Sequence, residues 1–189
     1  MRYPPGHKEE RRKELLKTSG EVIKNKGFSA TGVDALMAAA GMTSGAFYSN
    51  FSSKNELLKA LVESELERTR GIYEANPHTS PEAWLEFEID RYLSLSHAQR
   101  TESGCVIPAI GAEIARGGKE IKEVFEREQR KLVAILTEKL GSEALAWAFK
   151  AQLIGTIMMA RAMPTEAAQQ EVLDAGKKFL KAAVQSIRR

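Results

Sequence analysis

The sequence has little of what marks a secreted or membrane protein. A single cysteine, Cys105, stands among its 189 residues, so no disulfide can form within the chain and a disulfide-stabilised scaffold is excluded. The longest strongly apolar stretch, residues 144–160, contains Lys150 and Gln152, and it falls short of the ~20 apolar residues that a membrane-spanning helix needs. The chain opens on charged residues and not on the apolar segment of a secretory signal. We therefore expect a soluble, cytoplasmic protein with no membrane partner.

The patterns that mark enzymes are also missing. The three histidines, His7, His78 and His97, are scattered without metal-ligand spacing, and no glycine-rich phosphate-binding motif occurs. Cys105 has no evident general base near it in the sequence. We accordingly predict no catalytic residues, no metal and no cofactor, and a protein that is not an enzyme.

Charge is present in excess only at one end. The formal net charge is +3, and residues 1–55 carry nine Lys and Arg against five acidic residues, whereas the remainder is close to neutral. A basic segment of this kind suggests a surface that faces a polyanion. A solvated helix face that happens to be rich in lysine explains the charge equally well, so the decision depends on the motifs.

The apolar residues recur at helical spacing, and no segment alternates with a period of two. We predict an all-α protein of nine helices, the first three within about fifty residues and the others in a larger bundle. Gly27 and Gly41 are placed to end the first two helices. Thr31 is expected to cap the second helix, and Thr43 or Ser44 the third. Ser53 and Glu56 form a capping box that opens a fourth helix, over about 53–73.

The second and third helices, joined by Ala40-Gly41-Met42, have the pattern of a helix-turn-helix unit. Its predicted core consists of Val33, Leu36, Met42, Phe47 and Phe51. The opposite face of the third helix then carries small, hydrogen-bonding side chains that suit a major groove ~12 Å wide. Any small three-helix bundle has a polar outer face on its third helix, however, and that simpler interpretation remains open at this point.

The segment from Thr31 to Leu58, TGVDALMAAAGMTSGAFYSNFSSKNELL, resembles the signature of the TetR family of transcriptional regulators. The most specific part is Phe47-Tyr48-x-x-Phe51-x-x-Lys54-x-x-Leu57, and the resemblance extends over roughly residues 8–61. It implies a homodimeric, ligand-responsive DNA-binding protein, usually a repressor of a palindromic operator.

The resemblance also implies roles for individual residues toward double-stranded DNA. Tyr48 and Lys54 match phosphate-contacting positions, and Thr31 and Thr43 match helix starts that meet the DNA backbone. Base edges are expected nearest to Ser44, Ala46 and Asn50, with Gly45 allowing close approach. The chain departs from the commoner pattern at Ser49-Asn50, where a basic residue or histidine often stands, so it has fewer phosphate contacts there.

We expect two domains: residues 1–52 for DNA binding, and residues 53–189 for effector binding and dimerisation, with the fourth helix linking them. Small residues alternate with larger apolar ones (Phe149, Leu153 and Ile157) along residues 144–160, and the last predicted helix carries another apolar stripe, which favours a four-helix interface between two copies. The predicted interface residues are Ala148, Ala151, Gly155, Phe179 and Ala183. Packing of the same stripes within one monomer is the alternative.

The middle helices are expected to hold a pocket for a small apolar or amphipathic effector. The candidate lining residues are Trp84, Glu88, Tyr92, Cys105, Ile110, Phe125, Trp147 and Gln152. An aromatic core with Glu88 on the surface is the alternative for this set, and Cys105 is either a sensing thiol or an inert one. For the whole chain, the alternatives to a regulator are a helical protein-interaction module and a small helical enzyme.

Overall fold

The computed structural model describes residues 7–186, and these form ten α-helices, one short 3-10 helix and no strand. The all-α prediction is confirmed, with one more α-helix than expected. The extra helix arises because the predicted fifth helix is interrupted after Tyr92, and Ser94 caps a new one by accepting a hydrogen bond from the amide of His97. The elements are α1 (His7–Lys26), α2 (Val33–Ala39), α3 (Ser44–Tyr48), α4 (Lys54–Glu74), α5 (Pro81–Tyr92), α6 (Leu95–Gln99), η1 (Thr101–Ser103), α7 (Ile107–Arg116), α8 (Lys119–Leu140), α9 (Glu143–Arg161) and α10 (Glu166–Ser186).

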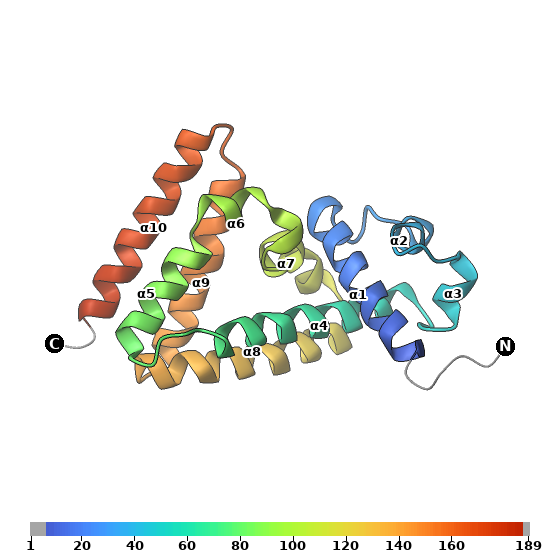
Figure 1. Ribbon diagram of the computed structural model, residues 1–189, viewed down its shortest axis with the longest axis horizontal. Coiled ribbons are helices and arrows are strands. Elements are labelled where there is room, and N and C mark those ends of the chain that lie inside the picture. Colours follow the sequence, from blue (N-terminus) through green and yellow to red (C-terminus); the bar gives the residue numbers. More distant parts are fainter. Residues whose placement is uncertain (1–6, 187–189) are drawn as a thin grey trace.

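The first three helices pack together at one end of the molecule, on the right of Figure 1. Gly27 follows α1 and Gly41 lies just beyond α2, with positive φ angles of 78° and 63°, a backbone conformation that glycine adopts without steric cost. Leu36, Met37, Phe47 and Phe51 fill the interior of this unit, whereas Val33 and Met42, expected in the core, are only partly buried at its edge.

The predicted caps of the short helices are corrected by the structure. Gly32, not Thr31, is the N-cap of α2, and it has no side chain with which to cap. Thr43 is the N-cap of α3, but its hydroxyl makes no capping hydrogen bond. At α4, Ser53 accepts from the amide of Glu56 as predicted, while Glu56 reaches back to the amide of Ser52 and not to that of Ser53. The predicted capping box is therefore only half formed.

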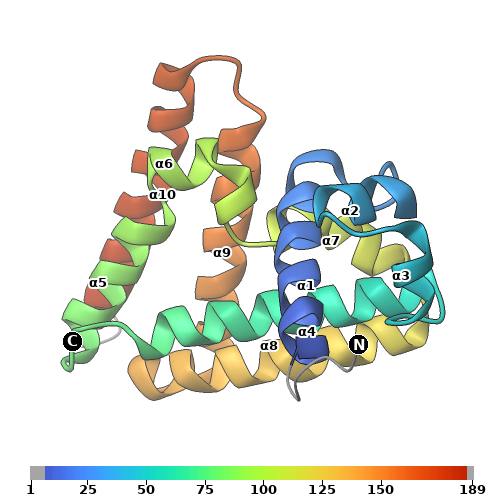
Figure 2. The ribbon, with the colours of Figure 1, turned by 45° about the vertical axis from the view of Figure 1, so that its right-hand side comes forward.

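The other helices form a larger bundle in which α4 runs along α8 (Figure 1) and the same pair lies side by side in the turned view (Figure 2). α9 packs against both α8 and α10, and α5 packs against α8 and α10. The α9–α10 contact is especially close at Gly176, where an added Cβ would lie 2.6 Å from Cγ2 of Thr156. One continuous apolar core connects the bundle with the first three helices.

α1 is the element that joins the two ends of the molecule. It packs against α4, α7 and the short η1 segment in addition to α2 (Figure 2). A displacement of η1 or α7 therefore acts directly on the N-terminal helices. No helix within residues 7–186 combines the length and the hydropathy needed to cross a bilayer.

Candidate DNA interface and effector site

Helix α3 is held from beneath by two phenylalanines. Phe47 on α3 and Phe51 just beyond it are each 1% exposed, and their ring centroids lie 5.9 Å apart. Tyr48 is 73% exposed, with its ring edge-on to that of Phe47 at a centroid distance of 5.1 Å. Burial of one aromatic ring thus turns its neighbour outward, and Tyr48 is available to an external partner.

Small polar residues surround Tyr48 at the start of α3. Thr43, Ser44 and Gly45 are exposed, and Ala46 is half-buried. The hydroxyl of Ser44 donates to the carboxylate of Asp34, which ties the start of α3 to α2. The side chains on the outer face of the helix-turn-helix unit are therefore short, so this face can approach another surface closely.

Lys54 stands at the edge of this face, half-buried at the beginning of α4. Its Nζ lies 3.5 Å from the carbonyl oxygen of Ser29 and 4.6 Å from the ring centroid of Phe28. Asn50 differs from its expected role because its side-chain amide donates to the carbonyl of Ala46 at 2.8 Å. That nitrogen serves the end of α3 and is not presented outward.

One residue expected to face DNA, and one lysine of the basic N-terminal segment, are instead inside the protein. Thr31 is 2% exposed, and its hydroxyl donates to the carbonyl of Gly27 at 2.7 Å, so it stabilises the end of α1. Lys24, counted with the basic N-terminal segment, is 5% exposed and pairs with Glu65. Neither side chain reaches the outer surface. Sequence periodicity could not reveal that Lys24 is buried, because its partner Glu65 lies on α4.

Hydrogen bonds as well as apolar contacts hold the N-terminal helices against the bundle. The carboxylate of Glu113 on α7 accepts from the backbone amides of Phe28 and Ser29 at 2.9 and 2.6 Å. Burial by itself would raise the pKa of Glu113, but these hydrogen bonds outweigh it and lower the pKa below its usual value. The carboxylate therefore stays ionised and holds the turn after α1 against α7.

A second set of hydrogen bonds to the N-terminal helices is made at the carbonyl oxygen of Gly104, which lies between η1 and α7. It accepts from Arg68 at 2.8 Å and from Lys24 at 3.4 Å. Gly104 is also packed so closely that a Cβ would lie 2.8 Å from the His97 ring and from Nη2 of Arg161. The segment before α7 is thus in direct contact with α1, α4 and α6.

His97 orients this segment through both nitrogens of its ring. Nε2 accepts from the amide of Cys105 at 3.0 Å, and Nδ1 lies 2.6 Å from the carbonyl oxygen of Tyr92. Since Nε2 is an acceptor, the proton is on Nδ1 and the imidazole is neutral. Burial lowers the pKa of His97 to about 4, in agreement with this arrangement.

The predicted effector residues do not gather around one cavity. Trp84, Glu88 and Tyr92 are all buried on one face of α5. Glu88 is only 1% exposed, so the alternative of a surface glutamate is wrong. Arg91 and Asn76 donate hydrogen bonds to its two carboxylate oxygens, so Glu88 is paired within the protein and is not presented to a ligand.

The other predicted effector residues are spread over the bundle. Ile110 is fully buried in the core and Phe125 is half-buried. Trp147 is 37% exposed and donates its indole N–H to Glu143, so it faces outward from α9. Gln152 lines a groove between α9 and α10, away from Tyr92. Only Tyr92 and Cys105 of the predicted set line the same cavities.

Two small cavities lie on either side of Thr69, Tyr92 and Cys105, which line both. One, of about 10 Å³, is completed by Tyr73, Lys150, Leu153 and Ile154. The other, of about 40 Å³, is completed by Arg68, Ile72, Arg91, His97, Ser103 and Gly104. Cys105 itself directly precedes Val106, the N-cap of α7.

Sequence reasoning missed Lys150, Tyr73 and Thr69 as cavity residues. Lys150 did give a signal, because it interrupts the longest apolar stretch of the chain. A charged residue inside an apolar helix calls for a partner or a function. Tyr73 and Thr69 gave none, since they lie at ordinary inward-facing positions of α4.

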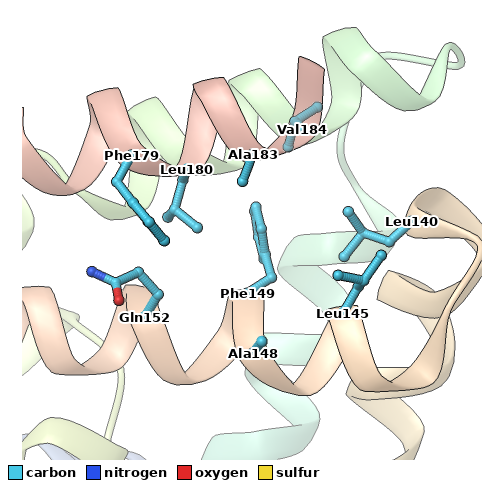
Figure 3. Close-up of a pocket in the computed structure, with 9 residues that line it drawn as sticks. All are labelled: Leu140, Leu145, Ala148, Phe149, Gln152, Phe179, Leu180, Ala183 and Val184. Atoms are coloured by element: carbon cyan, nitrogen blue, oxygen red, sulfur yellow. The ribbon is translucent and has the colours of Figure 1, made fainter. Parts of the chain in front are cut away.

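A larger groove, of about 290 Å³, lies between α9 and α10 (Figure 3). Phe149 and Gln152 project from α9, and Phe179 and Leu180 approach them from α10 (Figure 3). Leu140, Leu145, Ala148, Ala183 and Val184 complete its walls. Its lining is almost wholly apolar, and several of its residues belong to the predicted contact between copies.

The helix-turn-helix unit matches a known family model. Residues 15–61 match the family described as bacterial regulatory proteins, tetR family, and this range contains α2, α3 and the Phe47–Leu57 motif. This N-terminal part of the chain is therefore similar to the TetR family. Over 140 residues it is 26% identical to the HTH-type transcriptional regulator YerO of Bacillus subtilis (strain 168), a match that covers 72% of this chain and 46% of that protein. The chain thus spans less than half the length of this relative.

Solved structures share the fold over most of the chain. The structure of E. coli NemR superposes with a TM-score of 0.75 at 19% identity, covering 89% of this chain and 96% of that one. A structure of AibR in complex with isovaleryl coenzyme A and operator DNA has a TM-score of 0.64 at 14% identity, covering 89% of this chain and 97% of that one. The likeness therefore extends through the bundle and is not confined to residues 15–61.

The chain presents an apolar strip on the outside of its last two helices. Ala148 and Ala151 on α9 are exposed, and Gly155 is half-buried one turn further on. Met159 continues the strip at 59% exposure, and Phe179 on α10 is 60% exposed. A set of exposed apolar side chains on adjacent helices is typical of a surface that another protein covers.

Proposed function

We propose that this chain is a homodimeric repressor that binds a palindromic operator and releases it when a small molecule binds. The observation that carries the proposal is the 73% exposure of Tyr48, which the burial of Phe47 and Phe51 turns outward. The match of residues 15–61 to the TetR family model supports it. In this proposal residues 1–52 bind DNA, and residues 53–189 bind the effector and the second copy.

The DNA contacts proposed for this face are of two kinds. The Tyr48 hydroxyl and the Lys54 ammonium bind phosphate oxygens, with Thr43 near the backbone, and such contacts set the position of the protein on the duplex. Ser44, Gly45 and Ala46 lie nearest the base edges, and their small side chains let the helix enter the major groove. Asn50 is left with its side-chain oxygen for this purpose, since its amide nitrogen bonds Ala46.

A five-residue recognition helix reads few base pairs, so two copies are needed for a specific operator. We assign the contact between copies to the strip of Ala148, Ala151, Gly155, Phe179 and Ala183 on α9 and α10. The small residues on α9 permit close helix packing, and Phe179 offers a large apolar side chain to bury. In such a dimer the two α3 helices meet successive major grooves ~34–36 Å apart.

Effector control rests on the connection between the bundle and α1. The carbonyl of Gly104 and the carboxylate of Glu113 hold α1 and the turn after it. In this proposal the effector binds more tightly to the conformation in which the 103–105 segment is displaced than to the conformation that binds the operator. The operator affinity then falls by the difference between the two binding free energies, typically ~1–3 kcal/mol. AibR, whose structure contains both operator DNA and an acyl-coenzyme A, is a fold relative of this chain.

The test is selection of duplexes from a random library, followed by fluorescence anisotropy with the selected duplex. We expect a palindromic site, two chains bound per duplex, and an affinity that falls steeply as salt rises. The Tyr48→Ala/Lys54→Ala double variant should lose binding at least tenfold while its thermal melting stays unchanged. Lys178→Ala, an exposed lysine on α10, serves as the control and should bind normally.

Failure to select any duplex, with dimerisation intact, would contradict the repressor proposal and favour a helical protein-interaction module. Salt-independent binding would contradict it as well, since neutralising phosphates releases counterions.

A further inference from the structure

A buried lysine ammonium lies inside the bundle without a carboxylate partner. Lys150 on α9 is 5% exposed, and among the residues that the structure describes no carboxylate oxygen lies within 4.0 Å of its Nζ. Its aromatic neighbour is Tyr73, whose ring centroid is 5.8 Å from Nζ. Burial lowers the pKa of Lys150 to about 8, because removing water disfavours the charged form. A buried charge is costly unless an anion or strong acceptors accompany it.

The same cavity has a second unsatisfied donor. The hydroxyl of Tyr92 is buried and makes no hydrogen bond to an oxygen or nitrogen atom, and its polar neighbour is the Cys105 thiol. Tyr92 comes from α5 and Lys150 from α9, and both line the cavity of about 10 Å³. Two donors without an oxygen or nitrogen partner therefore line one small space. A buried polar group left unpaired costs about 1–3 kcal/mol, so the pair favours a ligand that can accept from both.

The rest of the cavity wall is mainly apolar. Leu153 and Ile154 on α9 and the ring of Tyr73 on α4 complete it, with Thr69 and Cys105 on the side of the second cavity. At about 10 Å³ the cavity holds no more than one water-sized body. A larger ligand enters only if the shared wall of Thr69, Tyr92 and Cys105 opens toward the neighbouring cavity of about 40 Å³.

Opening that wall bears directly on the segment that touches α1. Cys105 follows Gly104, whose carbonyl accepts from Lys24 of α1 and from Arg68 of α4. The amide of Cys105 is in turn held by His97. Displacement of Cys105 therefore strains hydrogen bonds that position α1, and α1 packs against α2 of the helix-turn-helix unit.

We propose that the effector of this protein is a small carboxylic acid with an apolar body, bound with its carboxylate between Lys150 Nζ and Tyr92 Oη. The apolar body lies against Leu153, Ile154 and the Tyr73 ring. Binding moves Cys105 and Gly104 away from Lys24 and so weakens operator binding. This inference rests on the proposed function for its consequence, but the ligand class follows from the cavity itself.

The ligand class is tested with acetate, butanoate and hexanoate, each compared with its uncharged amide. Calorimetric titration and thermal melting of the full chain, without DNA, give the affinities. We expect at least one carboxylate to bind tenfold or more tightly than its amide and to raise the melting temperature. Equal binding of acid and amide, or no binding of any of the three acids, would overturn the proposal.

Two variants place the binding at this cavity. Lys150→Met keeps the length of the side chain without its charge and should abolish the preference for the acid over the amide. Tyr92→Phe keeps the ring and removes only the hydroxyl, and it should weaken the acid about three- to tenfold; it also serves if Lys150→Met does not fold. Lys178→Met on the surface of α10 is the control and should bind like the parent chain. Unchanged preference in both cavity variants would refute the site.

Anisotropy with the selected duplex separates this inference from the proposed function. Operator binding by the free protein with no response to acids that bind would support the site and contradict effector control through it. Acid binding by a chain that fails to bind any duplex would support the ligand class and refute the repressor. Acid binding that lowers operator affinity supports both.

Discussion

The ammonium of Lys24 on α1 lies 3.1 Å from Oε2 of Glu65 on α4, and the two side chains are 2% and 7% exposed. Gly20 makes room for this pair, since a Cβ there would lie 2.5 Å from Oε1 of Glu65. Burial lowers the pKa of Lys24, although the charge of Glu65 opposes the shift. The N-terminal helices are therefore joined to the bundle by an ion pair shielded from solvent.

The two halves of this pair should not be equivalent. Glu65→Gln leaves the Lys24 ammonium buried with no carboxylate, and it should lower the free energy of unfolding by ~3–5 kcal/mol. Lys24→Met should cost less, about 1–3 kcal/mol, because Glu65 keeps Arg68 at 3.0 Å. Urea unfolding measures both. Lys13→Met, at an exposed pair with Glu9, is the control and should change little. A larger destabilisation by Lys24→Met than by Glu65→Gln would contradict the prediction.

Acid should destabilise the protein through His97. Its pKa in the folded chain is about 4, below the value of about 6.5 expected in the unfolded chain. Between these values the unfolded state binds one more proton, so stability is full above pH ~6.5 and falls as the pH drops toward 4. The loss amounts to at most about 3 kcal/mol.

The measurement is the free energy of unfolding from pH 7 to pH 4. His97→Asn should flatten the acid slope even if it lowers stability at neutral pH, and His78→Asn, at an exposed histidine, should leave the slope intact. An unchanged slope in His97→Asn would assign the acid sensitivity to other groups.

Gly104 should not tolerate a side chain. Gly104→Ala places a Cβ 2.8 Å from the His97 ring and from Nη2 of Arg161, so we expect a destabilisation of about 1–3 kcal/mol from overpacking. Gly71→Ala on α4 is the matched control, because nothing lies within 4 Å of its Cβ position and alanine favours a helix interior. Thermal melting should fall for the first variant and rise slightly for the second. Equal melting temperatures would show that the 103–105 segment yields easily.

Lys54 should contribute to DNA affinity through charge. Lys54→Met should weaken binding to all duplexes and reduce the slope of log K against log salt by about one, because one phosphate is no longer neutralised. Anisotropy over a range of salt concentrations measures the slope, and Lys139→Met is the control, since Lys139 lies on α8 above Trp84. A weaker complex with an unchanged slope would mean that Lys54 acts by holding the turn at Ser29 and not by binding phosphate.

Phe179 should decide the oligomeric state. Phe179→Glu puts a charge in the centre of the exposed apolar strip, and burying an unpaired carboxylate is costly, so the dimer should dissociate at micromolar concentration. Light scattering after size-exclusion chromatography gives the mass. Gln185→Glu adds the same charge on another side of α10 and should remain dimeric. A dimeric Phe179→Glu variant would remove the α9–α10 strip from the interface.

The parts of the molecule that can be predicted are those in which neighbours along the chain decide the structure. Helical periodicity, the positive φ of Gly27 and Gly41, and the alternation of Phe47 and Tyr48 between inside and outside all depend on a few consecutive residues. The predicted cap at Thr31 is wrong, and Thr43 takes the N-cap position of α3 without the capping hydrogen bond, because a hydroxyl near a helix start has several possible partners. In the structure Thr31 bonds the carbonyl of Gly27.

The sequence by itself determined an all-helical chain, a helix-turn-helix unit and an outward tyrosine on it, since each follows from local spacing. Only the tertiary structure decided that Lys24 and Glu88 are buried and paired, and that Tyr92, Cys105 and Lys150 surround one cavity. The physical reason is that a charged group or a hydroxyl is stable in an apolar interior only where another group pairs or hydrogen-bonds with it. For Lys24 that partner is 41 residues away, on a helix that folding brings alongside.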